Sequence, residues 1–237
     1  MADRLDAVLD HVAIAVPDAL AAEARWREQL GAGRSSQGQN SAFGSRQLIF
    51  AGGGKLELLT PPADGADGNF VGRFLERFGS TVHHVTLKVP DLHAALDVVA
   101  SAGLEAVDVR DDGEYWKEAF LRPSQVGGLV VQLAHTPYND DTWASLTGFT
   151  REAPRPDAVQ LLGPVLRHPD MDKATAVWTV LGAEVTPTDH GLRCTWPRSP
   201  LDVVVLAGEQ AGPVGLRIRG GQGLPADPAL GPAVVGE

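Results

Sequence analysis

The sequence predicts an α+β protein built from repeated modules, each with a strand, a helix and two or three further strands. Three observations predict this fold class: a nine-residue motif that occurs twice, an Ala-rich amphipathic stretch after each copy, and a pair of β-like runs after each stretch. Apolar residues follow a period of two, then about 3.6, then two again, which is the pattern of a strand, a helix and more strands.

The motif reads DHVAIAVPD at residues 10–18 and HHVTLKVPD at residues 83–91. Alternating residues of a strand point to opposite faces. The apolar face, expected to pack against a helix, holds Val12, Ile14 and Val16 in the first copy and Val85, Leu87 and Val89 in the second. The opposite face holds His11, Ala13 and Ala15, or His84, Thr86 and Lys88. A histidine followed by small or polar residues is typical of the floor of a cleft.

Each motif leads into a predicted helix and then into strands. The helices are expected at residues 18–30 and 91–102, with Asp18 and Asp91 as N-caps and Gly31 and Gly103 as C-cap signals. The strands are expected at 46–51, 55–60, 118–122 and 129–134. Residues 51–55, AGGGK, join two strands and predict a hairpin turn rather than a phosphate-binding loop. Between the copies, residues 69–79 have helical spacing after Asn69 and predict a connector helix that packs on the core.

A third, degenerate copy of the module is predicted after the second. LRHPD at 166–170 precedes a helical stretch and β-like runs at 191–196 and 201–206, but Gly163 stands where the first copy has His11. Residues 214–219 resemble the start of a fourth copy. The predicted organisation is a module pair at 1–137 (modules 1–62 and 81–137), a linker at 138–158, the third module at 159–220, and a Gly/Pro-rich tail at 221–237, frayed or draped over the fold.

Composition restricts the class of protein and its partners. Hydrophobic residues make up 43% of the 237 residues and charged residues 21%, which is typical of a globular chain. The net charge of -10 repels phosphate backbones and anionic lipid, so neither nucleic acid nor a membrane is expected as a partner. The absence of a long apolar run or a signal-like N-terminus predicts a cytoplasmic protein. The single cysteine, Cys194, excludes an internal disulfide and is expected to be a buried small hydrophobe.

Polar residues at repeat-related positions are the strongest indication of chemistry. His11 and His84 are equivalent in the two copies, and Glu57 and Gln132 occupy matching places in the last apolar strand of each module. Polar groups in such strands need partners. Any one of them alone is more typical of a hydrogen-bonded core histidine or an edge-strand carboxylate. Together they favour a metal site, because a metal needs ligands that converge from different strands.

At these residues the chain resembles the vicinal oxygen chelate (glyoxalase/bleomycin resistance/dioxygenase) superfamily, and within it methylmalonyl-CoA epimerases and, more distantly, glyoxalase I. The resemblance covers about the first 137 residues. It is carried by LDHVAIAVPD (9–18), KLELLTPP (55–62), NFVGRFLERFG (69–79), VHHVTLKVPD (82–91) and FLRPSQVGGLVVQL (120–133). It implies paired βαβββ modules that form a cupped mixed sheet around one divalent metal ion, Co, Ni, Zn, Mn or Fe. The implied ligands are His11, Glu57, His84 and Gln132, with His83 as the runner-up to His84.

The chain departs from the epimerase pattern at both positions where a base is expected. Epimerases have a glutamate where this chain has Gln132, and a second glutamate where it has Gln47. A glutamine cannot accept a proton near neutral pH, so Glu57 is the acidic candidate that is left. The prediction is a metal-dependent isomerase, epimerase or lyase in which Glu57 removes a proton α to a carbonyl that the metal polarises.

Two alternatives from other classes stay open at this stage. One is a non-catalytic small-molecule binding or resistance protein, and the other is an Fe(II) extradiol-type dioxygenase that uses His11, His84 and Glu57 as a facial triad. The substrate is expected to be a small molecule, an acyl-CoA or another carbonyl compound. Its candidate contacts are Gln47, Tyr115, Trp116, Lys117 and Arg122, although Tyr115 and Trp116 are equally typical of a hydrophobic lid or an interface. Paired-module proteins of this family often pair, which implies a homodimer unless the third copy covers the interface.

Overall fold

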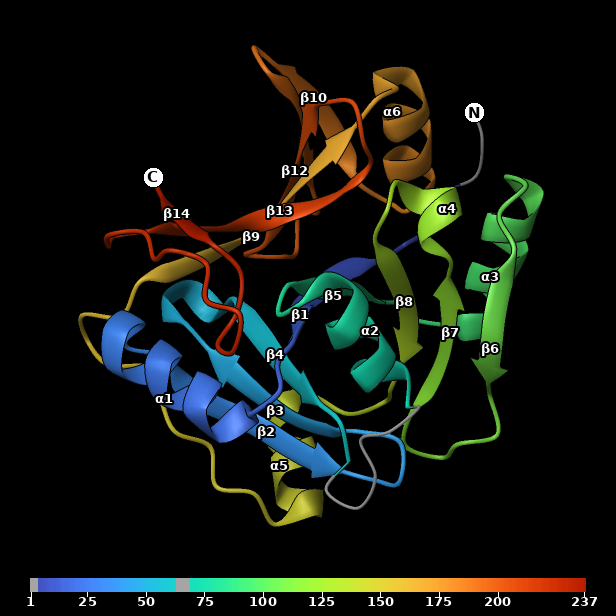
Figure 1. The fold of residues 1–237 in the computed structure, drawn as a ribbon. Coiled ribbons are helices and arrows are strands. Elements are labelled where there is room, and N and C mark those ends of the chain that lie inside the picture. The colour runs from blue at the N-terminus through green and yellow to red at the C-terminus, as the bar shows by residue number, and fades with distance from the viewer. Residues whose placement is uncertain (1–3, 63–68) are drawn as a thin grey trace. The chain divides into compact units, whose positions relative to one another are not determined.

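The computed structural model describes residues 4–62 and 69–237, whose strands form two sheets (Figure 1). The eight-stranded sheet has the order β2-β3-β4-β1-β5-β8-β7-β6. Its strands are β1 (Val8–Ala15), β2 (Gly33–Gln39), β3 (Gly44–Ile49), β4 (Lys55–Thr60), β5 (Val82–Lys88), β6 (Ala106–Arg110), β7 (Lys117–Leu121) and β8 (Val130–His135). Both sheets contain parallel and antiparallel pairs, which confirms the α+β class with mixed sheets.

The six-stranded sheet has the order β10-β11-β12-β9-β13-β14. Its strands are β9 (Gln160–His168), β10 (Glu184–Thr188), β11 (Gly191–Thr195), β12 (Asp202–Ala207), β13 (Gly212–Arg219) and β14 (Val234–Gly236). β12 is parallel to β9, and β10, β11 and β12 are antiparallel neighbours. The order β10-β11-β12-β9 is therefore the same, element for element, as the order β2-β3-β4-β1 of the first sheet.

The helices of the described chain are α1 (Ala19–Leu30), α2 (Phe70–Phe78), α3 (Leu92–Ser101), α4 (Pro123–Val126), α5 (Asp140–Thr147) and α6 (Met171–Val180). Three of them, α1, α2 and α3, begin directly after the N-cap residues that the sequence predicts. The Asp18 carboxylate accepts hydrogen bonds from two backbone N–H groups of α1, and the Asp91 carboxylate accepts one from the backbone N–H group of Ala94 in α3. Gly31 ends α1 in the left-handed region, at φ 75°, which favours a residue without a Cβ.

The first two βαβββ units have the predicted order of elements. In each of them the last strand returns parallel to the first, β4 beside β1 and β8 beside β5, and the middle strands pair antiparallel. The predicted turn at 51–55 joins the antiparallel strands β3 and β4 as expected. The short strands β2, β6, β10 and β14 had no clear apolar alternation, which is why the sequence did not predict them.

The described chain divides into two compact units, each made of three separate segments. Among the described residues, one unit contains 4–10, 84–138 and 164–213, and the other contains 11–62 with 69–83, 139–163 and 214–237. We call them the His84 unit and the His11 unit. Their segments interleave along the chain, and the predicted ranges for domains and linker stay a prediction.

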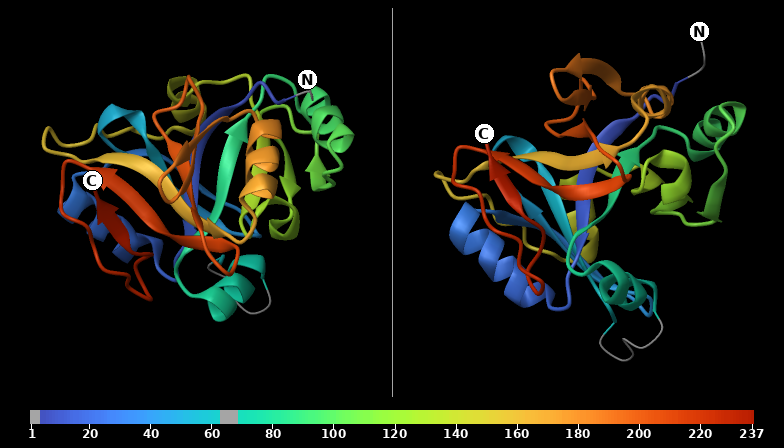
Figure 2. Two further views of the ribbon diagram at one scale, coloured as in Figure 1. Left: turned by 90° about the horizontal axis from the view of Figure 1, so that it is seen from above. Right: turned by 45° about the horizontal axis from the view of Figure 1, so that its top comes forward.

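The core of the His11 unit lies between α1 and the apolar face of β1. Trp26 of α1 is fully buried and meets Phe50 edge to face, with ring centroids 6.2 Å apart. The C-terminal segment lies along α1 (Figure 2), where Arg25 donates to the carbonyl of Pro225 at 2.7 Å. The same segment supplies strand β14, which pairs with β13 in the six-stranded sheet.

The core of the His84 unit includes a pair of tryptophans. Trp178 of α6 and Trp196 meet edge to face at 6.0 Å, and the indole N–H of Trp196 donates to the carbonyl of Leu181 at 3.1 Å. Cys194 is fully buried in β11, as predicted, and burial raises the pKa of its thiol to about 12. The prediction that Cys194 belongs to the core is confirmed, and Trp26 and Trp178 are buried as well.

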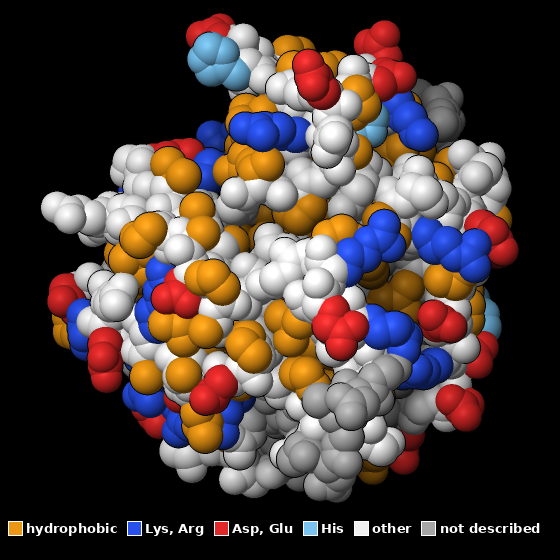
Figure 3. All heavy atoms as spheres, viewed as in Figure 1, with side chains coloured by type: hydrophobic (Ala, Val, Ile, Leu, Met, Phe, Trp, Pro, Cys, Tyr) orange, Lys and Arg blue, Asp and Glu red, His pale blue; other side chains and the backbone are white. Residues whose placement is uncertain are grey.

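The exposed surface carries charges of both signs. Figure 3 shows acidic and basic side chains interspersed on one face. Within the described residues, no helix is both long enough and apolar enough to cross a membrane.

Candidate metal centre

The first half of the candidate centre lies on neighbouring parallel strands of the His11 unit. Glu57 of β4 stands opposite Ala13 of β1, and His11 lies two residues before Ala13 and so on the same face. The Nε2 atom of His11 is 3.5 Å from the Oε2 atom of Glu57. Both side chains are largely buried, at 5% and 16% exposure, so two groups that bind metals converge at a place that is largely shielded from solvent.

Gln47 shares the face that carries Glu57. In the antiparallel pair of β3 and β4, Gln47 is directly opposite Glu57. Directly opposed residues point to the same side of a sheet, whereas the preceding residue, Arg46, points to the other side, where it contacts Glu23 of α1 at 2.8 Å. The predicted substrate contact Gln47 is therefore a neighbour of the predicted base.

The floor beside His11 and Glu57 is apolar and is covered by α2. Ala13, Ala15, Leu59 and Val71 form a buried cluster to which Phe43, Phe74 and Leu75 are added. The small alanines of β1 leave room for the rings and branched side chains of α2, which confirms that residues 69–79 form a connector that packs on the core.

His83, the runner-up ligand, lies against this aromatic cover. Its ring is 4.6 Å from the ring of Phe74 and 5.8 Å from that of Phe70, measured between centroids. Burial lowers the pKa of His83 to about 4, against a smaller raising effect from the negative charge of Glu57. His83 is thus a half-buried imidazole whose neutral form is favoured.

The second half of the candidate centre lies on the strands β5 and β8 of the His84 unit. His84 and Gln132 are buried, and Thr86, two residues after His84 on the same face, stands opposite Gln132. The Thr86 hydroxyl donates to the Oε1 atom of Gln132 at 2.6 Å. The amide oxygen of Gln132 is therefore directed along the face that carries His84.

A carboxylate that the sequence analysis missed holds the other end of the Gln132 amide. The Nε2 atom of Gln132 donates to the Oε2 atom of Glu118 on β7 at 2.7 Å. The indole N–H of Trp116 donates to the same oxygen at 2.9 Å, and Arg110 of β6 donates to the other oxygen at 2.9 Å. The alternation of β7 could have indicated Glu118, because Phe120 is opposite Gln132 and Glu118 lies two residues before Phe120.

The remaining predicted substrate contacts differ in their exposure to solvent. Trp116 is half-buried and is linked to Gln132 through Glu118. Lys117 of β7 is half-buried opposite His135. Tyr115 is exposed and stacks on Tyr138 at 5.8 Å between ring centroids. The Arg122 guanidinium is exposed and lies 3.4 Å from Glu105.

His11, Glu57 and His84 form a donor set that could hold a metal ion, among the residues that the structure describes. Two imidazoles and one carboxylate are the ligands that Zn, Fe, Co, Ni and Mn accept in proteins. The side chains present therefore fit a divalent metal by the chemistry of their donor atoms, and the amide oxygen of Gln132 is of a type that can add to them.

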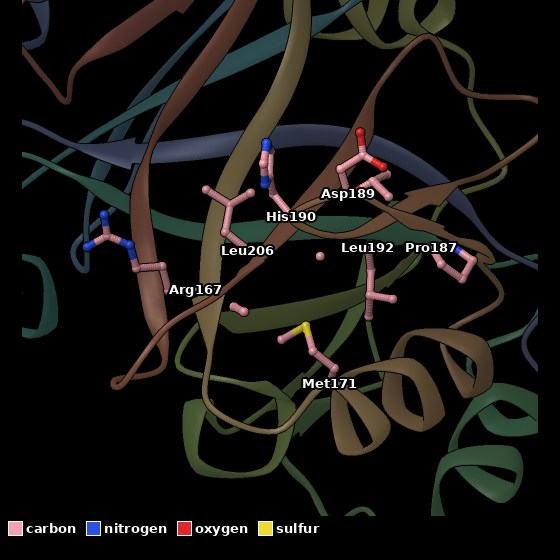
Figure 4. A pocket seen from close by; sticks show the side chains of 10 residues that line it. Arg167, Met171, Pro187, Asp189, His190, Leu192 and Leu206 are labelled. Carbon is pink, nitrogen blue, oxygen red and sulfur yellow. The ribbon is translucent and has the colours of Figure 1, made fainter.

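A separate groove of about 680 Å³ lies in the His84 unit (Figure 4). Its walls come from β9, α6, β12 and the hairpin of β10 and β11, and include Arg167, Met171, His190 and Leu206. None of the predicted site residues is among its described lining residues.

Comparisons with known proteins agree on one superfamily. A profile described as the glyoxalase/bleomycin resistance protein/dioxygenase superfamily matches residues 10–120. The ethylmalonyl-CoA/methylmalonyl-CoA epimerase of Cereibacter sphaeroides is 34% identical over 130 residues, which are 53% of this chain and 95% of that protein. The mitochondrial methylmalonyl-CoA epimerase of Mus musculus is 32% identical over 128 residues, which are 53% of this chain and 71% of that protein.

Solved structures extend the likeness in fold to the rest of the chain. A hypothetical protein from Staphylococcus aureus covers 98% of this chain and 99% of its own, with a TM-score of 0.68 and 13% identity. The methylmalonyl-CoA epimerase of Mycobacterium tuberculosis covers 61% of this chain and 95% of its own, with a TM-score of 0.51 and 22% identity. At such identities the likeness concerns the fold alone.

Proposed function

Because the chain belongs to the glyoxalase/bleomycin resistance protein/dioxygenase superfamily, we propose that it is a metal-dependent isomerase that moves a proton on the carbon next to a carbonyl group. The curated relatives named above are epimerases of ethylmalonyl-CoA and methylmalonyl-CoA. The substrate class proposed for this chain is accordingly an acyl-CoA whose α-carbon carries an acidic proton.

One observation carries the proposal: a largely buried carboxylate, Glu57, lies 3.5 Å from the imidazole of His11 on a face lined by small residues. A carboxylate in such a position can bind a cation and can also accept a proton. Glu57 is the acidic residue among positions 47, 57 and 132, the three positions compared with the epimerases, because residues 47 and 132 are glutamines. The role of base therefore falls to Glu57.

His11, Glu57, His84 and Gln132 are the proposed ligands of a divalent metal. When bound, the metal supplies positive charge that polarises the substrate carbonyl and makes the neighbouring C–H group more acidic. Three neutral ligands and one carboxylate leave a formal charge of about +1 at the centre, which favours an anionic substrate or intermediate.

The proton transfer is assigned to one oxygen of the Glu57 carboxylate. Glu57 takes the proton from one face of the α-carbon and leaves an enolate. A water molecule then protonates the opposite face of that carbon, and the protonated Glu57 returns its proton to solvent, which completes the isomerisation. Gln47, opposite Glu57, cannot take a proton and is proposed to donate a hydrogen bond to the substrate. The apolar cover that α2 provides over this face reduces the access of water to the carboxylate.

Contacts farther from the proposed reaction carry the rest of the substrate. Trp116, Tyr115, Lys117 and Arg122 are proposed to bind the CoA portion, with the two cations directed at its phosphates. Residues 159–220 are proposed as a third copy of the module that lacks the metal ligands. In that copy Val204 stands opposite Val165, as Glu57 stands opposite Ala13, so an apolar residue replaces the carboxylate.

The test combines metal content with exchange of the α-proton. Protein purified without chelator is analysed for metals and titrated with Co²⁺, and methylmalonyl-CoA is incubated with it in D₂O to follow deuterium uptake by mass spectrometry. We expect bound metal and rapid uptake. E57Q should slow uptake by at least about 100-fold, the usual loss when a general base is removed. E76Q, which changes an exposed glutamate of α2, is the matched control.

Other outcomes overturn the proposal or indicate one of the two alternative functions. Wild-type protein that neither contains nor binds metal overturns the proposal. Thermal stabilisation by acyl-CoA without deuterium uptake indicates the binding protein, and oxygen consumption with a catechol and Fe²⁺ indicates the dioxygenase.

A further inference from the structure

We propose that Glu118 is a positioning residue, which fixes the amide of Gln132 so that its oxygen faces the side that carries His84. The inference rests on the proposed function, because it takes Gln132 as one of the metal ligands. Glu118 is not one of the proposed ligands, and all the contacts on which the inference rests lie within the His84 unit.

Elementary hydrogen-bond chemistry determines which way the Gln132 amide points. An ionised carboxylate accepts hydrogen bonds and donates none. Because Glu118 lies 2.7 Å from one end of the amide, that end must be the NH₂ group. The carbonyl oxygen then lies at the other end, 2.6 Å from the Thr86 hydroxyl.

The orientation decides whether Gln132 can bind a cation. The oxygen of an amide is a metal ligand, and its NH₂ group is a donor with no lone pair available for a metal. The oxygen has two lone pairs, and the Thr86 hydroxyl occupies one of them. With Glu118 in place, the second lone pair stays available on the face of β5 and β8 that carries His84.

Glu118 is itself held so that it can perform this role. Arg110 Nη1 binds its Oε1 atom and Trp116 Nε1 binds its Oε2 atom, both at 2.9 Å, and the side chain is only 13% exposed. A side chain fixed by two neighbours loses little further freedom when it binds a third. Trp116 is thus assigned a second contact role, toward Glu118, besides the proposed contact with substrate.

The pair also accounts for the amide at position 132. A glutamate there would bring two carboxylates within hydrogen-bond distance, and like charges at that separation repel strongly. An amide at 132 and a carboxylate at 118 are therefore complementary, and exchanging the two residue types should preserve the contact.

The experiment measures Co²⁺ affinity by titration of metal-free protein and thermal unfolding of the same samples. In E118Q the side chain at position 118 can both donate and accept hydrogen bonds, so it can bind either end of the Gln132 amide and no longer fixes its orientation. E118D keeps the charge but is one methylene too short to reach Gln132. We expect both variants to bind Co²⁺ about 10- to 100-fold more weakly, as found for other residues that orient metal ligands. E184Q, which neutralises an exposed carboxylate on β10, should bind like wild type.

The exchange variant E118Q/Q132E separates positioning from a general loss of structure. Its amide at position 118 can donate to its carboxylate at position 132, so Co²⁺ affinity should return at least to the wild-type value. Unchanged affinity in E118Q and E118D, or no recovery in the exchange variant, overturns the role of Glu118. Wild-type protein that binds no Co²⁺ overturns the proposed metal function instead, so the two failures are distinguishable.

Discussion

At the residue scale, the repeat located the histidines and Glu57 but could not locate Glu118. His11 and His84 are 73 residues apart and match within the motif, and both lie on the faces that alternation predicts. Glu118 has Ser45 as its counterpart in the first module, because the two residues stand opposite the equivalent positions Ala134 and Leu59. A comparison between copies therefore gave no signal for a carboxylate, and the contact with Gln132 in the folded chain reveals its role.

The pH dependence of stability can test whether the thiol of Cys194 is buried. Because burial raises the pKa of its thiol to about 12 from the ordinary 9.0, the neutral thiol is favoured in the folded state. The stability that this contributes is fully present below about pH 9 and is lost as the pH rises toward 12. Wild type should therefore lose more thermal stability between pH 8 and pH 10.5 than C194A does. Equal losses in the two proteins would contradict the buried thiol.

At the scale of elements, the helices and long strands were predictable because each has its own local signal. Caps and apolar spacing set the starts of α1, α2, α3 and α6, and the observed helices begin within a residue of the expected positions. The strands β2 and β6 lack such a signal and are formed by pairing with β3 and β7. Their existence depends on tertiary pairing, which a local pattern does not contain.

α1 is tied to β2 and β3 by one buried carboxylate. Glu23 of α1 contacts Arg34 of β2 at 2.6 Å and Arg46 of β3 at 2.8 Å, and is itself almost fully buried. E23Q leaves these guanidinium groups beside one another without that charge. We expect a loss of about 2–3 kcal/mol in the free energy of unfolding, below the roughly 3–5 kcal/mol of a wholly buried pair because the arginines are partly exposed.

Urea denaturation of E23Q measures this loss. E28Q changes an exposed glutamate of the same helix and serves as the control, with an expected change within about 0.5 kcal/mol. Two variants of equal stability would show that α1 is held by its apolar face alone.

At the scale of the whole molecule, segments distant in sequence complete one another's cores. Gly231 of the C-terminal segment has φ 134°, and a Cβ there would lie 3.0 Å from Ile14 and 3.4 Å from Trp26. G231A should therefore lower the unfolding temperature more than G220A, which changes another glycine of positive φ with open space around it. Equal shifts in differential scanning calorimetry would show that backbone strain alone is responsible.

The interleaving of the two units has a consequence for how the chain is made. The His84 unit needs residues up to 213, and the His11 unit, which includes residues 11–83, also needs residues 214–237. A nascent chain that has emerged as far as residue 137 contains both predicted ligand histidines but neither finished core. Each unit therefore obtains its last segment only after most of the chain has been made, and the apolar strands that pair with that segment are expected to stay exposed until then.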